Sequence, residues 1–326
     1  MEFFDTLWLG KPLWMWFAFI GFVAALLSLD LGVLHRKQHE IGVGESLALS
    51  AMYIALGLSF GGWIWWQMGE EAGLAYITGF VIEKSLAMDN VFVIAMIFTY
   101  FAVPRIYQHR VLFWGILGVI VLRAIMIGVG AALVEQFSWV LYVFAAFLIA
   151  TGIKMWLSAD KNYDVGGSPV LSWINRRFRV TNTLHGERFW VRQRDAQTGR
   201  MTWFMTPLFL ALLMVEVADV IFAVDSVPAI FAITTDPFLV YTSNIFAILG
   251  LRALYFALAA MVERFHYLKY ALSVLLVFIG AKIFIADGLG LAKIPPAASL
   301  SITFAILALG VGWSLWKTRE KARAHA

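Results

Sequence analysis

The chain has 326 residues, of which 61% are hydrophobic and only 14% are charged, and its formal net charge is +4. A soluble domain cannot bury so large an apolar fraction, so the composition excludes a soluble globular protein and indicates a lipid environment. Cysteine is absent, which excludes disulfides, thiolate nucleophiles and cysteine-based metal sites. The six histidines lie outside the long apolar runs, so we expect no histidine ligand at membrane depth.

Nine apolar runs are long enough to cross a bilayer, whose core of about 30 Å requires about 20 helical residues. They predict an all-α membrane protein with about nine transmembrane helices in a single domain over residues 1–316, followed by a cytoplasmic tail at 317–326. The first run is too long for a cleaved signal, and basic residues follow it rather than precede it. The nine runs are 13–34, 45–66, 74–103, 111–134, 138–158, 204–233, 238–262, 268–286 and 296–316.

Basic residues in short loops predict the orientation, because Lys-rich and Arg-rich loops stay in the cytoplasm. Every loop after an odd-numbered run is basic, whereas the loops after even-numbered runs carry acidic residues or a single lysine. We therefore predict an N-terminus outside, a cytoplasmic C-terminus, and a multi-pass protein of the bacterial plasma (inner) membrane. The basic positions are Arg36, Lys37, Arg105, Arg110, eight residues between 159 and 203, Arg264, Lys269, Lys317, Arg319, Lys321 and Arg323.

Residues 159–203 form the one sizeable hydrophilic stretch between apolar runs. Its segment RFWVRQRDAQTGRMTWF alternates apolar and polar residues around a glycine, which predicts a β-hairpin of Arg188–Arg194 against Arg200–Met205. A basic cytoplasmic loop that fixes the topology is the simpler interpretation. A docking or regulatory role is the alternative.

Two halves of the chain resemble each other at a nearly constant offset of 128 or 129 residues. Because Glu135 is predicted outside and Glu263 inside, repeat A (about 74–158, spans 3–5) and repeat B (about 204–286, spans 6–8) are expected to be inverted in the membrane. Many secondary transporters have this organisation, with the binding site where the repeats meet. A duplication kept only for packing is the alternative. The matched segments are Val134–Tyr142 with Val262–Tyr270, Gly152–Lys154 with Gly280–Lys282, and Leu122–Ala124 with Leu251–Ala253.

The first helix of each repeat carries carboxylates in its apolar run. A charge near the bilayer centre costs about 2.5–3.5 kcal/mol even on insertion scales, so these residues need an explanation. Deep acids outnumber deep bases, so ion pairing alone leaves three acids that must be protonated, hydrated or neutralised by a bound cation. The acids are Asp30, Glu83, Asp89, Glu216, Asp219 and Asp225, and the bases are Lys84, Arg123 and Arg252.

All candidate ligands at depth are oxygens, which suit Mg²⁺, Ca²⁺ and Mn²⁺ better than zinc or copper. Pro228 suggests a break in span 6, and unwinding of span 3 is expected to bring Glu83 and Asp89 together. Clustered carboxylates titrate as coupled groups, which favours proton exchange. The predicted metal ligands are Glu83, Asp89, Asn90, Glu216, Asp219 and Asp225, with Asp30, Ser85 and Ser226 as accessory positions and Lys84, Arg123 and Arg252 as counter-charges.

Three motifs resemble the TerC family of integral membrane proteins: EKSLAMDNVFV at 83–93, EVADVIFAVDSVPAIFAITTDPF at 216–238, and SNIFAILGLRALYF at 243–256. The similarity extends from about residue 12 to residue 316. Motif order and the long loop between spans 5 and 6 look most like the Alx branch, which implies manganese export from the cytoplasm; the wider family carries a link to tellurium-ion resistance. The resemblance places the family's acidic positions on the six predicted ligands, with no departure.

The sequence thus favours export of a hard divalent cation, most simply Mn²⁺, as substrate, with no organic cofactor and lipid as the surroundings. A metal sensor or scaffold without net transport is the alternative, which the hairpin favours. An intramembrane enzyme is disfavoured, because the HExxH zinc motif is missing, so we predict a protein that is not an enzyme. Surplus carboxylates repel anions, and no soluble basic surface for nucleic acid is available.

Overall fold

The computed structural model describes residues 2–29, 42–158, 164–195, 199–259, 267–288 and 294–324. Helices account for most of them, and two short hairpins supply the strands. The helices are α1 (Glu2–Asp5), α2 (Leu13–Leu29), α3 (Val43–Met68), α4 (Glu70–Tyr100), α5 (Arg105–Gln136), α6 (Val140–Leu157), α7 (Pro169–Arg177), α8 (Pro207–Phe231), α9 (Pro237–Leu249), α10 (Leu251–Ala259), α11 (Leu268–Gly288) and α12 (Pro296–Ala324). The strands are β1 (Leu7–Trp8), β2 (Lys11–Pro12), β3 (Trp190–Arg194) and β4 (Met201–Met205).

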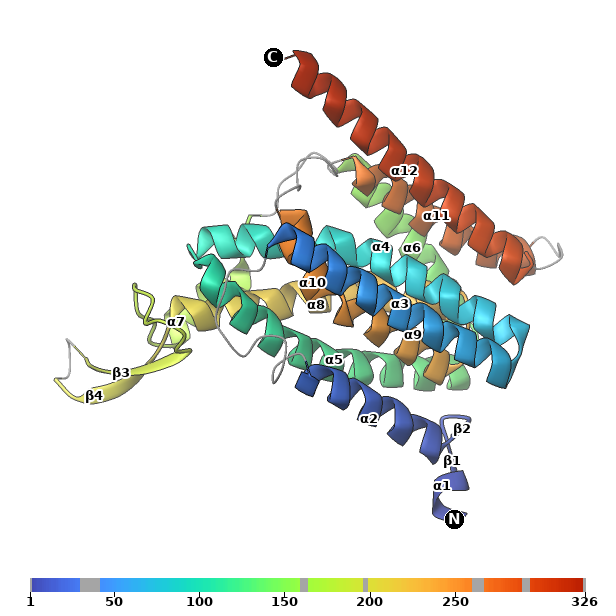
Figure 1. Ribbon diagram of the computed structural model, residues 1–326, viewed down its shortest axis with the longest axis horizontal. Coiled ribbons are helices and arrows are strands. Elements are labelled where there is room, and N and C mark those ends of the chain that lie inside the picture. The colour runs from blue at the N-terminus through green and yellow to red at the C-terminus, as the bar shows by residue number, and fades with distance from the viewer. Residues whose placement is uncertain are drawn as a thin grey trace.

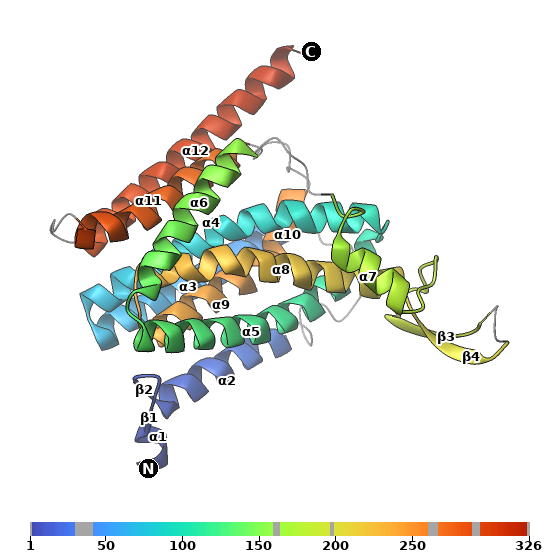
Figure 2. The same ribbon diagram turned by 180° about the vertical axis from the view of Figure 1, so that it is seen from behind.

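The long helices lie side by side in one bundle, with α2 along one side and α6, α11 and α12 along the other (Figures 1 and 2). Within the described residues, 6 helices are long and apolar enough to cross a membrane: α3, α5, α6, α8, α11 and α12. Helices α2 and α9 are apolar but shorter, and α4 is long but carries Glu83, Lys84 and Asp89 in its middle. The predicted all-α membrane fold is confirmed, whereas the number of nine spans and the orientation stay predictions.

The break in the helical path lies in span 7 and not where the sequence predicts it. Helix α9 ends at Leu249 and α10 begins at Leu251. The Lys84 ammonium group donates to the carbonyl of Ala247 across 3.1 Å, so it satisfies one of the carbonyls left free at the end of α9. The free carbonyls of a broken helix therefore lie on α9, beside α4.

The predicted break at Pro228 and the predicted unwinding of span 3 are both wrong. Helix α4 is continuous from Glu70 to Tyr100, and α8 continues past Pro228 to Phe231. Proline deprives a helix of one backbone donor, but Pro228 stands in the last turn of α8, where few further hydrogen bonds remain to be lost. The convergence of carboxylates must therefore come from different helices.

Helices α6 and α11 cross antiparallel at a pair of glycines. A Cβ on Gly152 would lie 2.7 Å from the carbonyl oxygen of Ser273, and a Cβ on Gly280 would lie 2.6 Å from that of Ala145. Gly152 and Gly280 are 128 positions apart, and so are Ala145 and Ser273. Small residues let two helix backbones approach closely. Each glycine therefore contacts the repeat counterpart of the residue that the other glycine contacts. An approximate two-fold axis between the two helices would produce this pattern.

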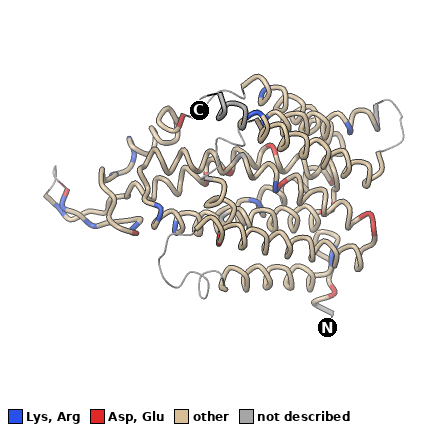
Figure 3. Tube along the Cα trace, turned by 45° about the horizontal axis from the view of Figure 1, so that its top comes forward, with Lys and Arg blue, Asp and Glu red and all other residues tan. Residues whose placement is uncertain are grey.

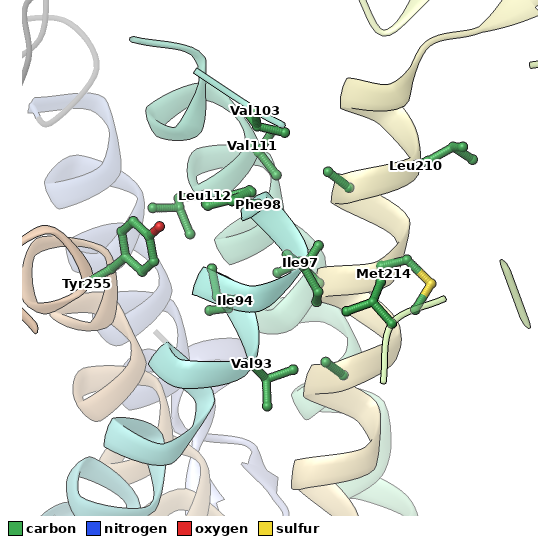
Figure 4. Close-up of a cluster of buried hydrophobic side chains, with 14 of the residues drawn as sticks. Val93, Ile94, Ile97, Phe98, Val103, Val111, Leu112, Leu210, Met214 and Tyr255 are labelled. Atoms are coloured by element: carbon green, nitrogen blue, oxygen red, sulfur yellow. The ribbon is translucent and has the colours of Figure 1, made fainter. Parts of the chain in front are cut away.

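The buried hydrophobic side chains at the hairpin end of the bundle form an apolar plug. Ile97 on α4 points toward α8, and Phe98 points toward Val111 and Leu112 on α5 (Figure 4). Ile97, Val111 and Met214 are each 0% exposed. The apolar plug consists of Ile94, Ile97, Phe98, Val111, Leu112, Leu208, Ala211 and Met214.

A hairpin projects from the bundle where the sequence predicts one. Strand β3 pairs antiparallel with β4, with Trp190 opposite Met205 and Arg194 opposite Met201. It extends beyond the helix ends next to the start of α8 (Figure 1) and carries basic residues (Figure 3). The same stretch holds the short helix α7, which the sequence interpretation did not include.

Candidate functional site

A buried ionic cluster joins α4, α5 and α8 in the middle of the bundle. Arg123 Nη1 lies 3.0 Å from Glu83 Oε1. The same guanidinium faces Asp219, with Nε 3.4 Å from Oδ2 and Nη2 3.4 Å from Oδ1. Arg123 also donates to Ser226 Oγ across 2.5 Å, and the Ser226 hydroxyl hydrogen-bonds to Glu83. These four side chains are called the Arg123 cluster below.

The Arg123 cluster lies far from both helix ends and far from solvent. At about 1.5 Å per residue, Glu83 is about 20 Å along α4 and Asp219 about 18 Å along α8. Arg123 is 0% exposed, Glu83 1% and Asp219 7%. The first helix of each sequence repeat therefore contributes one carboxylate to a common buried site.

The charges of the Arg123 cluster do not balance, since two carboxylates share one guanidinium. Glu83 Oε2 is buried without a hydrogen-bond partner among the described residues. Buried charges are normally paired and fully hydrogen-bonded, because each charge loses its hydration on burial. With both carboxylates ionised the cluster carries one net negative charge, which a proton or a cation could neutralise, and one carboxylate oxygen is left for such a partner.

Glu216 lies one helical turn before Asp219 on α8 and has no ion-pair partner within the described part of the chain. Its Oε2 atom is buried and unpartnered there. The carboxylate packs against Gly118 of α5, where any Cβ would collide with it. Gly118 therefore makes the space that this carboxylate occupies.

Asp225 on α8 lines the small cavity beside Glu83 and Arg123, but its contacts are with α6. It hydrogen-bonds to the Thr151 side chain and lies within electrostatic range of Lys154. The positive charge of Lys154, which is exposed near the end of α6, favours the ionised form of this carboxylate. The counterpart residue in repeat B, Lys282, instead donates to Ser299 Oγ across 3.3 Å.

Two small cavities adjoin the Arg123 cluster and share Asn90 and Phe222 in their walls. One of about 20 Å³ touches Glu83, Arg123 and Ser226, and one of about 30 Å³ touches Asp219. A water molecule needs about 10–15 Å³ on this measure. The smaller cavity therefore has room for one or two waters and the larger for two or three, so a metal ion would have to enter with most of its hydration shell replaced by protein oxygens.

Of the other predicted site residues, some lie outside the described part of the chain and one makes a hydrogen bond within its own helix. Asp30 lies outside the described residues, as do the side chains of Asp89 and Arg252. The Ser85 hydroxyl donates to the carbonyl of Val81 across 2.7 Å, so it is occupied within its own helix. Among the described residues, no three His, Asp or Glu side chains meet as a ready-made metal site. The predicted ligand roles therefore stay predictions. Glu83 and Asp219 do converge, but the group between them is the guanidinium of Arg123.

Asn244 is a site candidate that the sequence reasoning missed. It lies on α9 with 0% exposure, and both its amide oxygen and its amide nitrogen are without partners among the described residues. A buried amide normally finds hydrogen-bond partners, so an orphaned one indicates a site for water or an ion. The signal was present in the sequence as a polar pair, Ser243–Asn244, inside an otherwise apolar run.

The fold and the site together define a multi-helix membrane protein with a buried ionic cluster of two carboxylates around one arginine. The chain belongs to the integral membrane protein TerC family, which matches residues 68–322. It is 47% identical over 326 residues to "Uncharacterized membrane protein STKORF319" of Myxococcus xanthus, with 100% of this chain and 98% of that protein covered. It is 46% identical over 316 residues to "Putative membrane-bound redox modulator Alx" of Escherichia coli K12, with 94% and 95% covered. No solved structure matches the chain.

Proposed function

We propose that this protein exports a hard divalent cation, Mn²⁺, from the cytoplasm through the Arg123 cluster. The observation that carries the proposal is the convergence of Glu83 and Asp219, from the first helices of two sequence repeats, on a single buried arginine. The cluster retains a negative charge, and its surroundings offer carboxylate, amide and hydroxyl oxygens. Such donors suit Mn²⁺, Mg²⁺ and Ca²⁺, and the family motifs favour manganese among them.

Arg123 acts as a tethered cation that holds the two carboxylates when no metal is bound. A divalent ion entering between Glu83 and Asp219 supplies the charge that the guanidinium otherwise supplies, so Arg123 can release the two carboxylates and keep its hydrogen bond to Ser226. Glu216 adds a further carboxylate one turn along α8, and a proton exchanged at these coupled carboxylates would balance the charge of each cycle. No step requires the protein to act as an enzyme.

The two repeats supply the transport geometry in this proposal. Antiparallel packing of α6 on α11 through repeat-related glycines, and of α4 against α8 through the Arg123 cluster, supports inverted repeats with a site between them. Nine spans, an outer N-terminus and a bacterial plasma (inner) membrane location complete the arrangement. The basic hairpin then lies in the cytoplasm.

A metal sensor or scaffold without net transport is the second candidate. The projecting hairpin favours it, because such an arm offers a surface for contact with another protein. The relatives named as redox modulators are compatible with either candidate. The two candidates differ in one measurable property, which is flux.

Flux of Mn²⁺ into sealed proteoliposomes, followed with an enclosed metal-sensitive dye, tests the proposal. We expect saturable flux that Asp219→Asn abolishes. Glu135→Gln serves as the matched control, because Glu135 is an exposed acid at the end of α5. Mn²⁺ binding without flux in the unaltered protein would establish the sensor instead, and equal flux in Asp219→Asn and Glu135→Gln would remove the Arg123 cluster as the site.

A further inference from the structure

A large cavity opens at the end of the bundle opposite the hairpin. Its volume is about 760 Å³, and it lies among the first turns of α4, the end of α8 and the start of α12. Glu71 and Thr235 are exposed at its mouth. Thr78 and Phe231 are each 2% exposed and form its base. The cavity therefore runs from the surface of the bundle into its interior.

The base of this cavity lies close to the Arg123 cluster. Thr78 precedes Glu83 by five residues on α4, and Phe231 follows Ser226 by five residues on α8. Five residues rise about 7.5 Å along a helix. The small cavity that touches Glu83 and Ser226 extends in the other direction, because its further wall residues on these helices are Leu86, Asn90, Phe222 and Asp225. Less than two helical turns therefore separate the ionic site from space that water can fill.

The opposite side of the Arg123 cluster is closed by the apolar plug. Along α8, the residues from Leu208 to Ala218 span about 15 Å, and the buried ones among them belong to the plug or its surrounding apolar cluster. Leu208 and Ala211 are each 0% exposed. Hydrophobic constrictions block ions by excluding water. Among the described residues, the cavity that touches Asp219 on this side holds only about 30 Å³ and has the plug residues Ile94 and Leu112 in its wall, so a hydrated cation from the hairpin end would have to displace the plug.

The two ends of the bundle are related by the repeat, yet they are packed differently. Val111 in the plug corresponds at the 129-residue offset to Val240, and Tyr255 beside the plug corresponds to Met126. Val240 and Met126 belong to a smaller apolar cluster near the large cavity. Repeat-built transporters alternate between two such packings, one open at each end.

We infer that the large cavity is the access chamber of the Arg123 cluster on the outer side of the membrane and that the apolar plug is its closed gate on the hairpin side. The inference rests on the proposed function and adds an exit route to it, since a cation released from Glu83 and Asp219 leaves past Thr78 and Phe231. Loading of the cation from the cytoplasm requires the apolar plug to open while the apolar cluster that contains Val240 closes the other end.

Cysteine accessibility tests the inference cleanly, because the natural chain has no cysteine. Thr78→Cys reports the base of the chamber and Ala211→Cys reports the gate, and both replace small side chains. Thr235→Cys at the chamber mouth and Met201→Cys on the exposed hairpin identify the two sides of the membrane. Each variant is labelled with a membrane-impermeant maleimide in right-side-out and in inside-out vesicles, without metal.

We expect Thr235→Cys and Thr78→Cys to react in right-side-out vesicles, and Met201→Cys only in inside-out vesicles. Ala211→Cys should react about a hundredfold more slowly than Met201→Cys from the hairpin side, and Ile97→Ala should remove much of that difference by opening the plug. Labelling of Thr78→Cys from the hairpin side alone, or rapid labelling of Ala211→Cys, would overturn the inference. Mn²⁺ flux of the same variants is a separate readout. If the labelling is as expected but no variant transports Mn²⁺, the chamber and the gate are supported and transport is refuted. If Mn²⁺ is transported but the labelling is reversed, transport is supported and the chamber and gate are refuted.

Discussion

Replacing Arg123 with glutamine should test both the stability of the buried cluster and its proposed exchange with metal. Breaking a buried ion pair by removal of one partner costs about 3–5 kcal/mol, because the remaining charge stays buried without compensation. Arg123 is 0% exposed and serves two carboxylates. We therefore expect Arg123→Gln to lose about 5 kcal/mol of unfolding free energy in metal-free detergent solution.

Added Mn²⁺ should restore part of that loss. A ligand that binds only the folded protein stabilises it by about 2.7 kcal/mol at one hundred times its Kd. In Arg123→Gln the cation position is free, so the stabilisation by MnCl₂ should exceed that of the unaltered protein, in which the guanidinium competes. Denaturant titration followed by tryptophan fluorescence, with and without MnCl₂, measures both effects.

Arg110→Gln is the matched control. Arg110 pairs with Glu187 at 3.0 Å, but the two side chains are 40% and 30% exposed, and exposed ion pairs contribute only about 0–1 kcal/mol. If Arg123→Gln fails to accumulate, the double variant Glu83→Gln/Arg123→Gln keeps the net charge of the cluster unchanged and should be milder. A stability loss no larger than that of Arg110→Gln, or one that MnCl₂ does not relieve, would refute the reasoning.

Three further outcomes are expected. Gly118→Ala should lower Mn²⁺ flux by displacing the adjoining carboxylate, whereas Gly128→Ala, on the same helix with no atom near its Cβ position, should leave flux unchanged. Asn244→Leu should keep or raise the unfolding free energy, because an orphaned amide gives way to an apolar group of similar size, but should lower flux; normal flux would show that Asn244 holds no ion. Gly280→Ala should cost about 1–3 kcal/mol by overpacking against the carbonyl of Ala145, and unchanged denaturation midpoints would contradict the tight α6–α11 contact.

Local sequence was sufficient for the elements of this fold. Apolar runs of about 20 residues require helices in lipid, because only internal hydrogen bonds can satisfy the backbone there. The hairpin was predicted for the same kind of reason, since alternation around Gly199 is a local pattern. Three details in this category were missed: span 3 is not unwound, the short helix α7 was not predicted, and the helix break falls at Gly250 rather than at Pro228, because a proline in the last turn costs a helix little.

The residue types of the site could also be predicted from the sequence, but the ion pairs between them could not. An excess of acids over bases in apolar runs follows from counting, and Arg123 could be named as a counter-charge. Which acids it serves depends on how α4, α5 and α8 pack. Glu83 and Asp219 are 136 positions apart, and no local pattern relates them.

The sequence by itself thus determined that the chain is a helical membrane protein with surplus buried acid and two related halves, because hydrophobic length, charge and repetition are properties of the chain. Only the tertiary structure decided that one arginine holds a carboxylate from each half, that Asp225 beside them hydrogen-bonds to Thr151 of α6, and that the bundle is hollow at one end and plugged at the other. Those outcomes depend on contacts between helices distant in the chain, where packing and the cost of an uncompensated charge select among arrangements that the sequence leaves open.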